Sequence, residues 1–340
     1  MKEIIDSIQK KLTDDKEANT HMLLEELEKN KNNQEVVKAI YKMLYDNLPE
    51  DLQDNFVKNI NQEKFQERMK EIQELIADKQ YERSLKYLDM AIDKLDQIHE
   101  DDNNIYMTFH DPFEAYLYAY NREDKNTLKK LIKNAPMDFG VYYKFRGLIL
   151  NELNRYDEAE TAFVESLKWN PLDFEAVFGY ANSLYGLKKY DEYLKLNIET
   201  LDKAYINYVI ASCYHNIGKY YLTKNTKEDD VKAYNIISYS IAFAETDYAY
   251  KDLDTICVKY KMEKTLAKEK DVFDTLKKEN IQTGPSEKLV KQLIDIARSF
   301  IGKQDQFALQ VFKVIYQLTH DEITLQYIKA GERAIAAKKK

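Results

Sequence analysis

The chain has 340 residues, more than one compact core usually holds, and its 8 Gly and 5 Pro favour long helices over many short strands. A hydrophobic content of 44% excludes a disordered chain. The formal net charge of −8 makes nucleic acid an unexpected partner, because binding it depends on neutralising phosphates.

The N-terminal residues, MKEIIDSIQKKL, carry charges throughout and lack the apolar centre of a signal peptide. No apolar run approaches the roughly 20 residues that cross a bilayer, so no membrane contact is expected. The two lone cysteines, Cys213 and Cys257, fit a reducing compartment. These features predict a cytoplasmic protein.

Residues 1–62 read as a polar N-terminal helical region with a break at NLPED. This region shows no small-residue turn between two short apolar helices, so it offers no helix-turn-helix for reading DNA. Residues 63–250 are predicted to form a repeat array, in which ADKQYERSLKYLDMAI fits the repeat pattern only in part. The array is interrupted at 100–138, where Pro112 and Pro136 bracket an irregular hairpin.

The clearest helical pattern lies in YDEAETAFVESLKW, where Tyr156, Ala159, Phe163 and Leu167 recur at intervals of three and four. A second stripe precedes it through Tyr143, Gly147 and Leu150. Only a few residues around Asn154 separate the stripes, which predicts an antiparallel pair of helices. The pattern recurs after 34 residues. At that interval, Gly147, Leu150 and Tyr156 are followed by Ala181, Leu184 and Tyr190.

These residues resemble the tetratricopeptide repeat, a 34-residue helical hairpin. Its small, aromatic and proline positions are matched by Gly147, Tyr156, Ala159, Phe163, Ser166 and Pro171. The next unit is weaker in its second helix, and a third has Ala211, Tyr214 and Gly218 followed by an insertion at 221–230. The resemblance implies an all-α fold, an α-α superhelix in which hairpins form a right-handed solenoid, with helical N- and C-terminal extensions.

Residues 251–340 are expected to form a C-terminal helical region. It contains one degenerate repeat-like hairpin in IGKQDQFALQVFKVI, followed by a terminal helix. A capping box of Thr319 and Glu322 is predicted to open that helix, which would shield the open end of the array.

Catalytic motifs are not found. The five histidines are scattered without zinc spacing, HEDDNN at 99–104 reads as a solvated turn, and Asp111–Pro112 as a helix opening. Cys213 and His215 are two residues apart on a helix and therefore cannot face each other. The sequence predicts a protein that is not an enzyme, with no metal and no cofactor.

The resemblance implies that the first helix of each hairpin lines a concave groove. Its groove positions fall on Lys144, Leu148, Asn151, Phe178, Asn182, Tyr185, Tyr208, Ser212 and His215. Only Lys144 could serve in the basic clamp with which some relatives hold a terminal carboxylate, so clamping is not expected. Aromatic residues around Asn182 suit an extended peptide with apolar side chains. Alternatively, these aromatics pack between helices or against the chain's own termini.

The predicted function is a cytoplasmic adaptor that binds a peptide or protein segment in this groove. A peptide-responsive bacterial regulator is one alternative, although the N-terminal region lacks a DNA-reading element. An oligomeric scaffold, with the C-terminal helix docking on a second copy in a homodimer, is another. An enzyme with an unrecognised site is the least favoured.

Overall fold

The computed structural model describes residues 2–49, 65–93, 97–122 and 128–338. The chain divides into two compact units between Lys79 and Gln80. The predicted boundary at about residue 62 lies outside the described residues.

The first unit is helical. Its elements are α1 (Lys2–Gln9), α2 (Lys16–Lys29), α3 (Gln34–Asn47) and a helical segment at 65–77. Asp15 and Asn33 cap α2 and α3 by accepting backbone N–H bonds, and Leu23 and Ile40 are fully buried. The helix α3 ends at Asn47, just before Pro49, where the sequence predicted a break.

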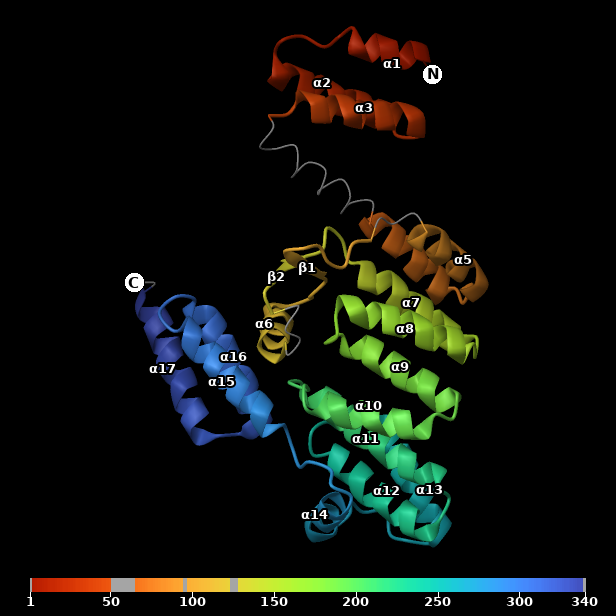
Figure 1. Cartoon of the computed structure of the whole chain (residues 1–340), viewed down its shortest axis with the longest axis vertical. Coiled ribbons are helices and arrows are strands. Elements are labelled where there is room, and N and C mark those ends of the chain that lie inside the picture. Colours follow the sequence, from red (N-terminus) through yellow and green to blue (C-terminus); the bar gives the residue numbers. More distant parts are fainter. Residues whose placement is uncertain (1, 50–64, 94–96, 123–127, 339–340) are drawn as a thin grey trace. The chain divides into compact units, whose positions relative to one another are not determined.

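The second unit contains the remaining elements (Figure 1). These are α5 (Tyr81–Ile92), β1 (Asn104–Met107), α6 (Pro112–Asn121), β2 (Leu131–Asn134), α7 (Phe139–Glu152), α8 (Tyr156–Trp169), α9 (Phe174–Gly186), α10 (Tyr190–Leu201), α11 (Asn207–Thr223), α12 (Lys227–Ser240), α13 (Asp247–Tyr260), α14 (Glu269–Lys278), α15 (Glu287–Phe300), α16 (Asp305–Thr319) and α17 (Glu322–Lys338). The architecture is all-α apart from the two short strands.

Three successive hairpins, α7–α8, α9–α10 and α11–α12, confirm the predicted repeat. The second helices of the first two begin 34 residues apart, at Tyr156 and Tyr190. Each hairpin turns through a residue with left-handed backbone, namely Asn154 (φ 58°), Lys188 (φ 60°) and Asn225 (φ 55°). The predicted insertion at 221–230 is not a loop, because it lengthens α11 and then starts α12.

The small residues of the repeat allow close packing of the helices. Ala159 and Ala181 are fully buried, and the ring of Phe163 lies against Gly147. Tyr143 is only half-buried, whereas the neighbouring Tyr142 is fully buried. The tetratricopeptide-like hairpins are therefore stacked as predicted. In the first of them, Tyr142 takes the buried position that was predicted for Tyr143.

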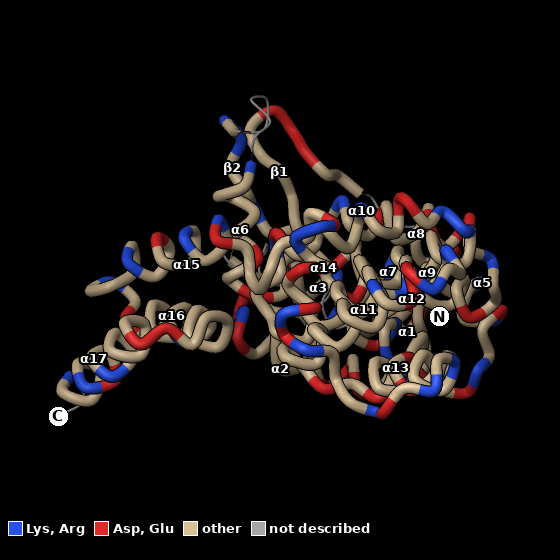
Figure 2. Tube along the Cα trace, turned by 90° about the horizontal axis from the view of Figure 1, so that it is seen from below, with Lys and Arg blue, Asp and Glu red and all other residues tan. Residues whose placement is uncertain are grey.

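The segment expected as an irregular hairpin contains a small parallel sheet, which the sequence analysis missed. β1 pairs with β2, and α6 lies between them in the sequence. Figure 2 shows acidic residues in red before β1 and basic residues in blue near β2, and Lys130 Nζ lies 3.1 Å from Glu100 Oε2. The helix α6 begins at Pro112 with Asp111 as its cap, as the Asp–Pro pair predicted.

The C-terminal helices return to α6. Asn121 of α6 and Gln292 of α15 exchange two amide hydrogen bonds of 3.2 and 2.9 Å, and Tyr120 donates to Asp295 at 2.9 Å. Further along the chain, α16 packs on α15, and α17 packs on α16. Thus α17 covers α16.

The predicted capping box is wrong. Thr319 is the last residue of α16, and the hydroxyl of Thr319 donates to Ile315 O. Asp321 opens α17 instead, because its carboxylate accepts from Thr324 N at 2.7 Å.

Within the part of the chain that the structure describes, no helix is both long enough and apolar enough to cross a bilayer.

Candidate functional site

A pocket of about 290 Å³ lies among the helices α9, α11 and α13. We call it the α11 pocket. Its lining comes from α9, α11 and α13, and consists of Phe178, Asn182, Tyr208, Ser212, His215, Asn216, Lys219 and Tyr248. Five of the nine residues expected in a groove therefore line one pocket: Phe178, Asn182, Tyr208, Ser212 and His215.

Most of the wall comes from one face of α11. Tyr208, Ser212, His215 and Lys219 are spaced by four, three and four residues, so their side chains lie on the same side of the helix. The opposite side of α11 faces the core, where Cys213 and Tyr214 are fully buried. Burial raises the pKa of the Cys213 thiol, which disfavours the reactive thiolate.

Hydroxyl groups gather at one side of the pocket. The Ser212 and Tyr248 hydroxyl oxygens lie 3.1 Å apart, which joins α11 to α13. Hydrogen bonding to Tyr248 raises the pKa of Tyr208, whose side chain is exposed. Three hydroxyl groups can therefore donate to, or accept from, a group that enters the pocket.

His215 also connects α11 to α13. Its Nε2 lies 2.9 Å from Asp252 Oδ2, and the centre of the His215 ring lies 4.5 Å from that of Tyr248, with the two ring planes tilted by 55°. Because His215 is buried and bonded to a carboxylate, it serves mainly to fix the position of α13 beside α11.

Lys219 is the cation of the pocket. Its Nζ lies 4.5 Å from the centre of the Tyr185 ring, a cation–π contact. Burial lowers the pKa of Lys219, and the nearby charge of Asp252 offsets only part of that effect. Lys219 is half-buried and forms no ion pair with a carboxylate among the described residues.

Asn182 lies at the exposed rim. Its neighbour in sequence, Ala181, is fully buried against the partner helix, whereas Asn182 is exposed. One helical step of about 100° separates them, as the sequence predicted. The amide of Asn182 is therefore available to a ligand.

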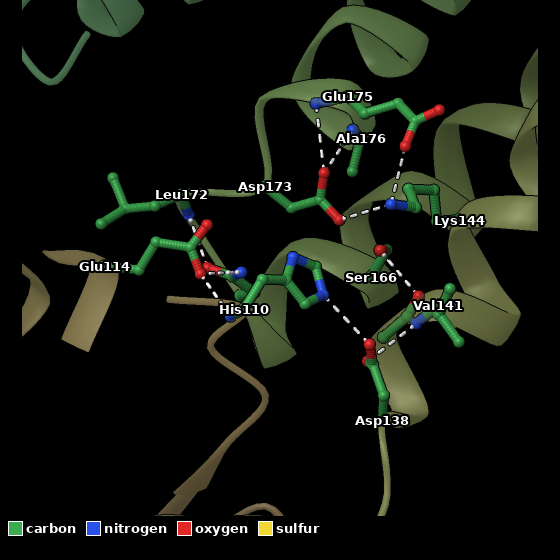
Figure 3. A network of polar contacts seen from close by, with 12 residues as sticks. His110, Glu114, Asp138, Val141, Lys144, Ser166, Leu172, Asp173, Glu175 and Ala176 are labelled. Carbon is green, nitrogen blue, oxygen red and sulfur yellow. Dashed lines mark hydrogen bonds and ion pairs between the residues drawn. The ribbon is translucent and has the colours of Figure 1, made fainter. Parts of the chain in front are cut away.

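Lys144 lies outside the pocket, and its place among the predicted groove residues is wrong. Its Nζ lies 3.0 Å from Asp173 Oδ2 and 2.8 Å from Glu175 Oε2, as Figure 3 shows. Burial alone would lower the pKa of Lys144, but these two carboxylates raise it above the usual value. The side chain is only 10% exposed, so it fixes α7 to the start of α9 and cannot reach a ligand.

Asn151, Leu148 and Tyr185 are likewise not in the lining. The Asn151 amide donates to Gly179 O at 2.8 Å and accepts from the Ser183 hydroxyl at 2.9 Å, so it connects two hairpins. Leu148 is half-buried. The Tyr185 ring packs against that of Tyr193 and contacts the Lys219 ammonium. Asn151 and Tyr185 therefore make contacts between helices.

Sequence analysis missed three lining residues, Asn216, Lys219 and Tyr248. Lys219 could have been found, because it continues the stripe of Tyr208, Ser212 and His215 by four residues. Tyr248 could not, since its place depends on how α13 packs beside α11.

The described residues contain no group of three or more His, Cys, Asp or Glu that could hold a metal ion. A second polar network surrounds His110, whose Nε2 lies 3.0 Å from Asp138 Oδ2 (Figure 3). Glu114 accepts bonds from His110 N and Asn170 Nδ2. This network joins α6 to α7 and α8, and the Asp111 and Asp138 carboxylates in it also cap helices.

No family model matches this chain, and no curated protein matches its sequence. Among solved structures, it is similar to one described as the crystal structure of the P58(IPK) TPR domain at 2.5 Å. The identity is 11%, the match covers 96% of this chain and 79% of that chain, and the TM-score is 0.28. At this TM-score, the repeat fold rests on the hairpins described above and not on the likeness.

Proposed function

We propose that this protein is a non-catalytic interaction module that binds a segment of a partner protein in the α11 pocket. The observation that carries the proposal is the convergence of side chains from three helices, α9, α11 and α13, on one opening. Such openings between stacked hairpins are where repeat proteins bind extended chains. The two free, buried thiols fit a cytoplasmic location.

The chemistry of the lining suits a polypeptide. Phe178 and Tyr208 offer apolar and aromatic surface, and Tyr208 is 53% exposed. An exposed aromatic side chain gains most when a partner covers it. Asn182 can donate to a backbone carbonyl and accept from a backbone N–H of any sequence.

The test compares proteins retained from native cytosol on immobilised full-length chain, quantified by mass spectrometry. Asn182→Ala should leave the free energy of unfolding within about 0.5 kcal/mol, as for a surface site. It should weaken retention of the specific partner by about 1–3 kcal/mol if buried hydrogen bonds are lost. Gln310→Ala, which removes an exposed amide from α16, is the matched control and should retain partners as the natural chain does. Equal retention by Asn182→Ala, with the fold intact, would place the binding surface elsewhere.

A further inference from the structure

We propose that β2 binds an extended segment of a partner protein as a third strand, and that this segment carries acidic and apolar side chains on one face. The binding surface is the side of β2 turned away from β1, which we call the β2 edge. This surface lies outside the α11 pocket and is independent of the function proposed for that pocket.

Both sides of β1 are already occupied within the chain. On one side, β1 pairs in parallel with β2. On the other side, the Tyr106 N–H donates to His99 O at 2.8 Å, and the Thr108 N–H donates to Trp169 O at 3.0 Å. A further strand therefore has no place beside β1.

The outer side of β2 is not covered by any described residue. The N–H groups of Leu131 and Ala135 donate to carbonyl oxygens of β1 and of the residue before it, each at 2.8 Å. Backbone groups alternate in direction along a strand, so the N–H and C=O groups of Ile132 and Asn134 point away from β1. None of these four groups has a hydrogen-bond partner in the part of the chain that the structure describes. The β2 edge thus offers two donors and two acceptors in the arrangement with which an added strand pairs.

The β2 edge is short and has defined ends. At its start, two nitrogens of the Arg122 guanidinium donate to Lys130 O, each at 3.1 Å. Beyond its end, Pro136 has no N–H to offer. Two strands alone form a sheet of marginal stability, so a third strand adds to the stability of this one.

The side chains beside the β2 edge select an acidic segment. Leu131 and Lys133 point to the same face of the sheet, and both are exposed, Leu131 to 65%. Lys129 lies two residues earlier and is also exposed. Lys130 pairs with Glu100, whereas neither Lys129 nor Lys133 forms an ion pair among the described residues. Because opposite charges across neighbouring strands attract, these two lysines favour acidic side chains on either side of an apolar one that covers Leu131.

The same lysines disfavour a second copy of β2 as the occupant. If two copies paired edge to edge, the lysines of one copy would face those of the other, and like charges opposite each other destabilise a sheet. The chain as a whole is acidic, with a net charge of −8. Charges more than about 8 Å away are largely screened at physiological salt, so the lysines beside the edge decide which strand is attracted.

The test measures the dissociation constants of fluorescent peptides, blocked at both ends, for the full-length chain. The parent peptide is Thr-Glu-Thr-Val-Thr-Glu-Thr, which reads the same in both directions and therefore fits either orientation of an added strand. A second peptide has Gln in place of Glu. Two further peptides carry two N-methyl groups each, on the inner threonines in one and on the valine and one glutamate in the other.

We expect the Gln peptide to bind about tenfold more weakly than the parent, because it loses two ion pairs across the strands. Alternate N–H groups of an added strand point towards the edge and away from it. One N-methylated peptide should therefore bind like the parent, and the other should bind about tenfold more weakly or worse.

Variants of the chain test the same contacts. Asn134→Pro removes one outward N–H without breaking a bond to β1 and should weaken binding of the parent peptide about threefold to tenfold, whereas Asn134→Ala keeps this donor and should bind normally. Lys133→Glu should weaken binding about tenfold. Lys251→Glu, at an exposed lysine of α13, makes the same change in net charge and should have no effect. Asn182→Ala, in the α11 pocket, should also bind the peptide normally.

Each other result overturns strand addition at the β2 edge. Equal binding of the two N-methylated peptides would show contact through side chains alone, and equal binding of the Glu and Gln peptides would remove the acidic partner. Loss of binding in Asn182→Ala would place the peptide in the α11 pocket and so support the proposed function instead. Failure of the parent peptide to bind overturns the β2 edge alone, because retention of partners in the α11 pocket is measured separately. A dimer of the natural chain that Asn134→Pro abolishes, measured by light scattering, would make a second copy the occupant.

Discussion

The ring of Phe163 fills the space that a side chain at Gly147 would need. A Cβ placed on Gly147 would lie 2.7 Å from Phe163 Cζ, which is closer than two non-bonded carbon atoms come in a packed protein. A Cβ placed on Gly179 would meet the same atoms of the ring, so both glycines pack against its tip. Because these residues lie on α8, α7 and α9, the ring joins the first hairpin to the second.

Phe163→Ala should therefore be among the most destabilising substitutions in the array. The ring is 0% exposed, and its removal leaves a cavity that costs about 3–5 kcal/mol. Urea denaturation of the purified variant measures this loss. A loss below about 1 kcal/mol would show that the ring is not enclosed.

Gly147→Ala should destabilise the protein, although alanine normally favours a helix. Forcing a methyl group into a packed core costs about 1–3 kcal/mol, which outweighs the helix propensity gained. Gly331→Ala in α17 is the control, because its added Cβ would meet Leu309 Cδ1 at an ordinary 3.5 Å. There the free energy of unfolding should rise by up to about 1 kcal/mol. If the thermal unfolding midpoints of both variants shift in the same direction, this would contradict the tight packing at Gly147.

Lys144→Met should destabilise the junction of α7 and α9. The change leaves Asp173, which is 8% exposed at its side chain, without its cation. Breaking a buried pair costs about 3–5 kcal/mol, and the lower value is expected because Asp173 still accepts from two backbone N–H groups. Lys168→Met removes an exposed pair with Glu165 and should cost under about 1 kcal/mol. Comparable unfolding midpoints for the two variants would contradict the structural role of Lys144.

The pair of His110 and Asp138 should make stability depend on pH. Hydrogen bonding to Asp138 raises the pKa of His110 in the folded state, although burial opposes it. A raised folded pKa means that the stabilisation is complete below the unfolded value of about 6.5 and is lost as pH rises through the folded value. The difference in urea midpoint between the natural chain and His110→Gln should therefore be largest near pH 6 and shrink towards pH 8. A difference that grows with pH would contradict the assignment.

The sequence was sufficient for the parts of the fold made by neighbouring residues. The hairpin α7–α8 follows from stripes at helical spacing and a short turn, and Gly147 and Phe163 were placed correctly. The strands β1 and β2 were missed because their four-residue segments pair with each other across α6, and short segments carry little periodic signal.

The residues of the candidate site could likewise be predicted only in part. The groove positions that the resemblance implies gave Tyr208, Ser212 and His215, which do line the pocket. Lys144 was assigned wrongly because spacing does not show that Asp173 and Glu175, on the next helix, already bind it. Contacts between helices decide which groove residues remain free.

The bond between Tyr120 and Asp295 spans 175 residues of the sequence. During synthesis, at about 5–20 residues per second, α6 must therefore wait roughly 10 to 35 seconds for the helix that covers it. In that interval Phe113, Tyr116 and the amide of Asn121 lack the aromatic and polar partners that α15 and α16 later supply. The hairpins of the array, by contrast, can close as soon as each leaves the ribosome. The newly made chain thus exposes this face of α6 until α15 and α16 have been synthesised.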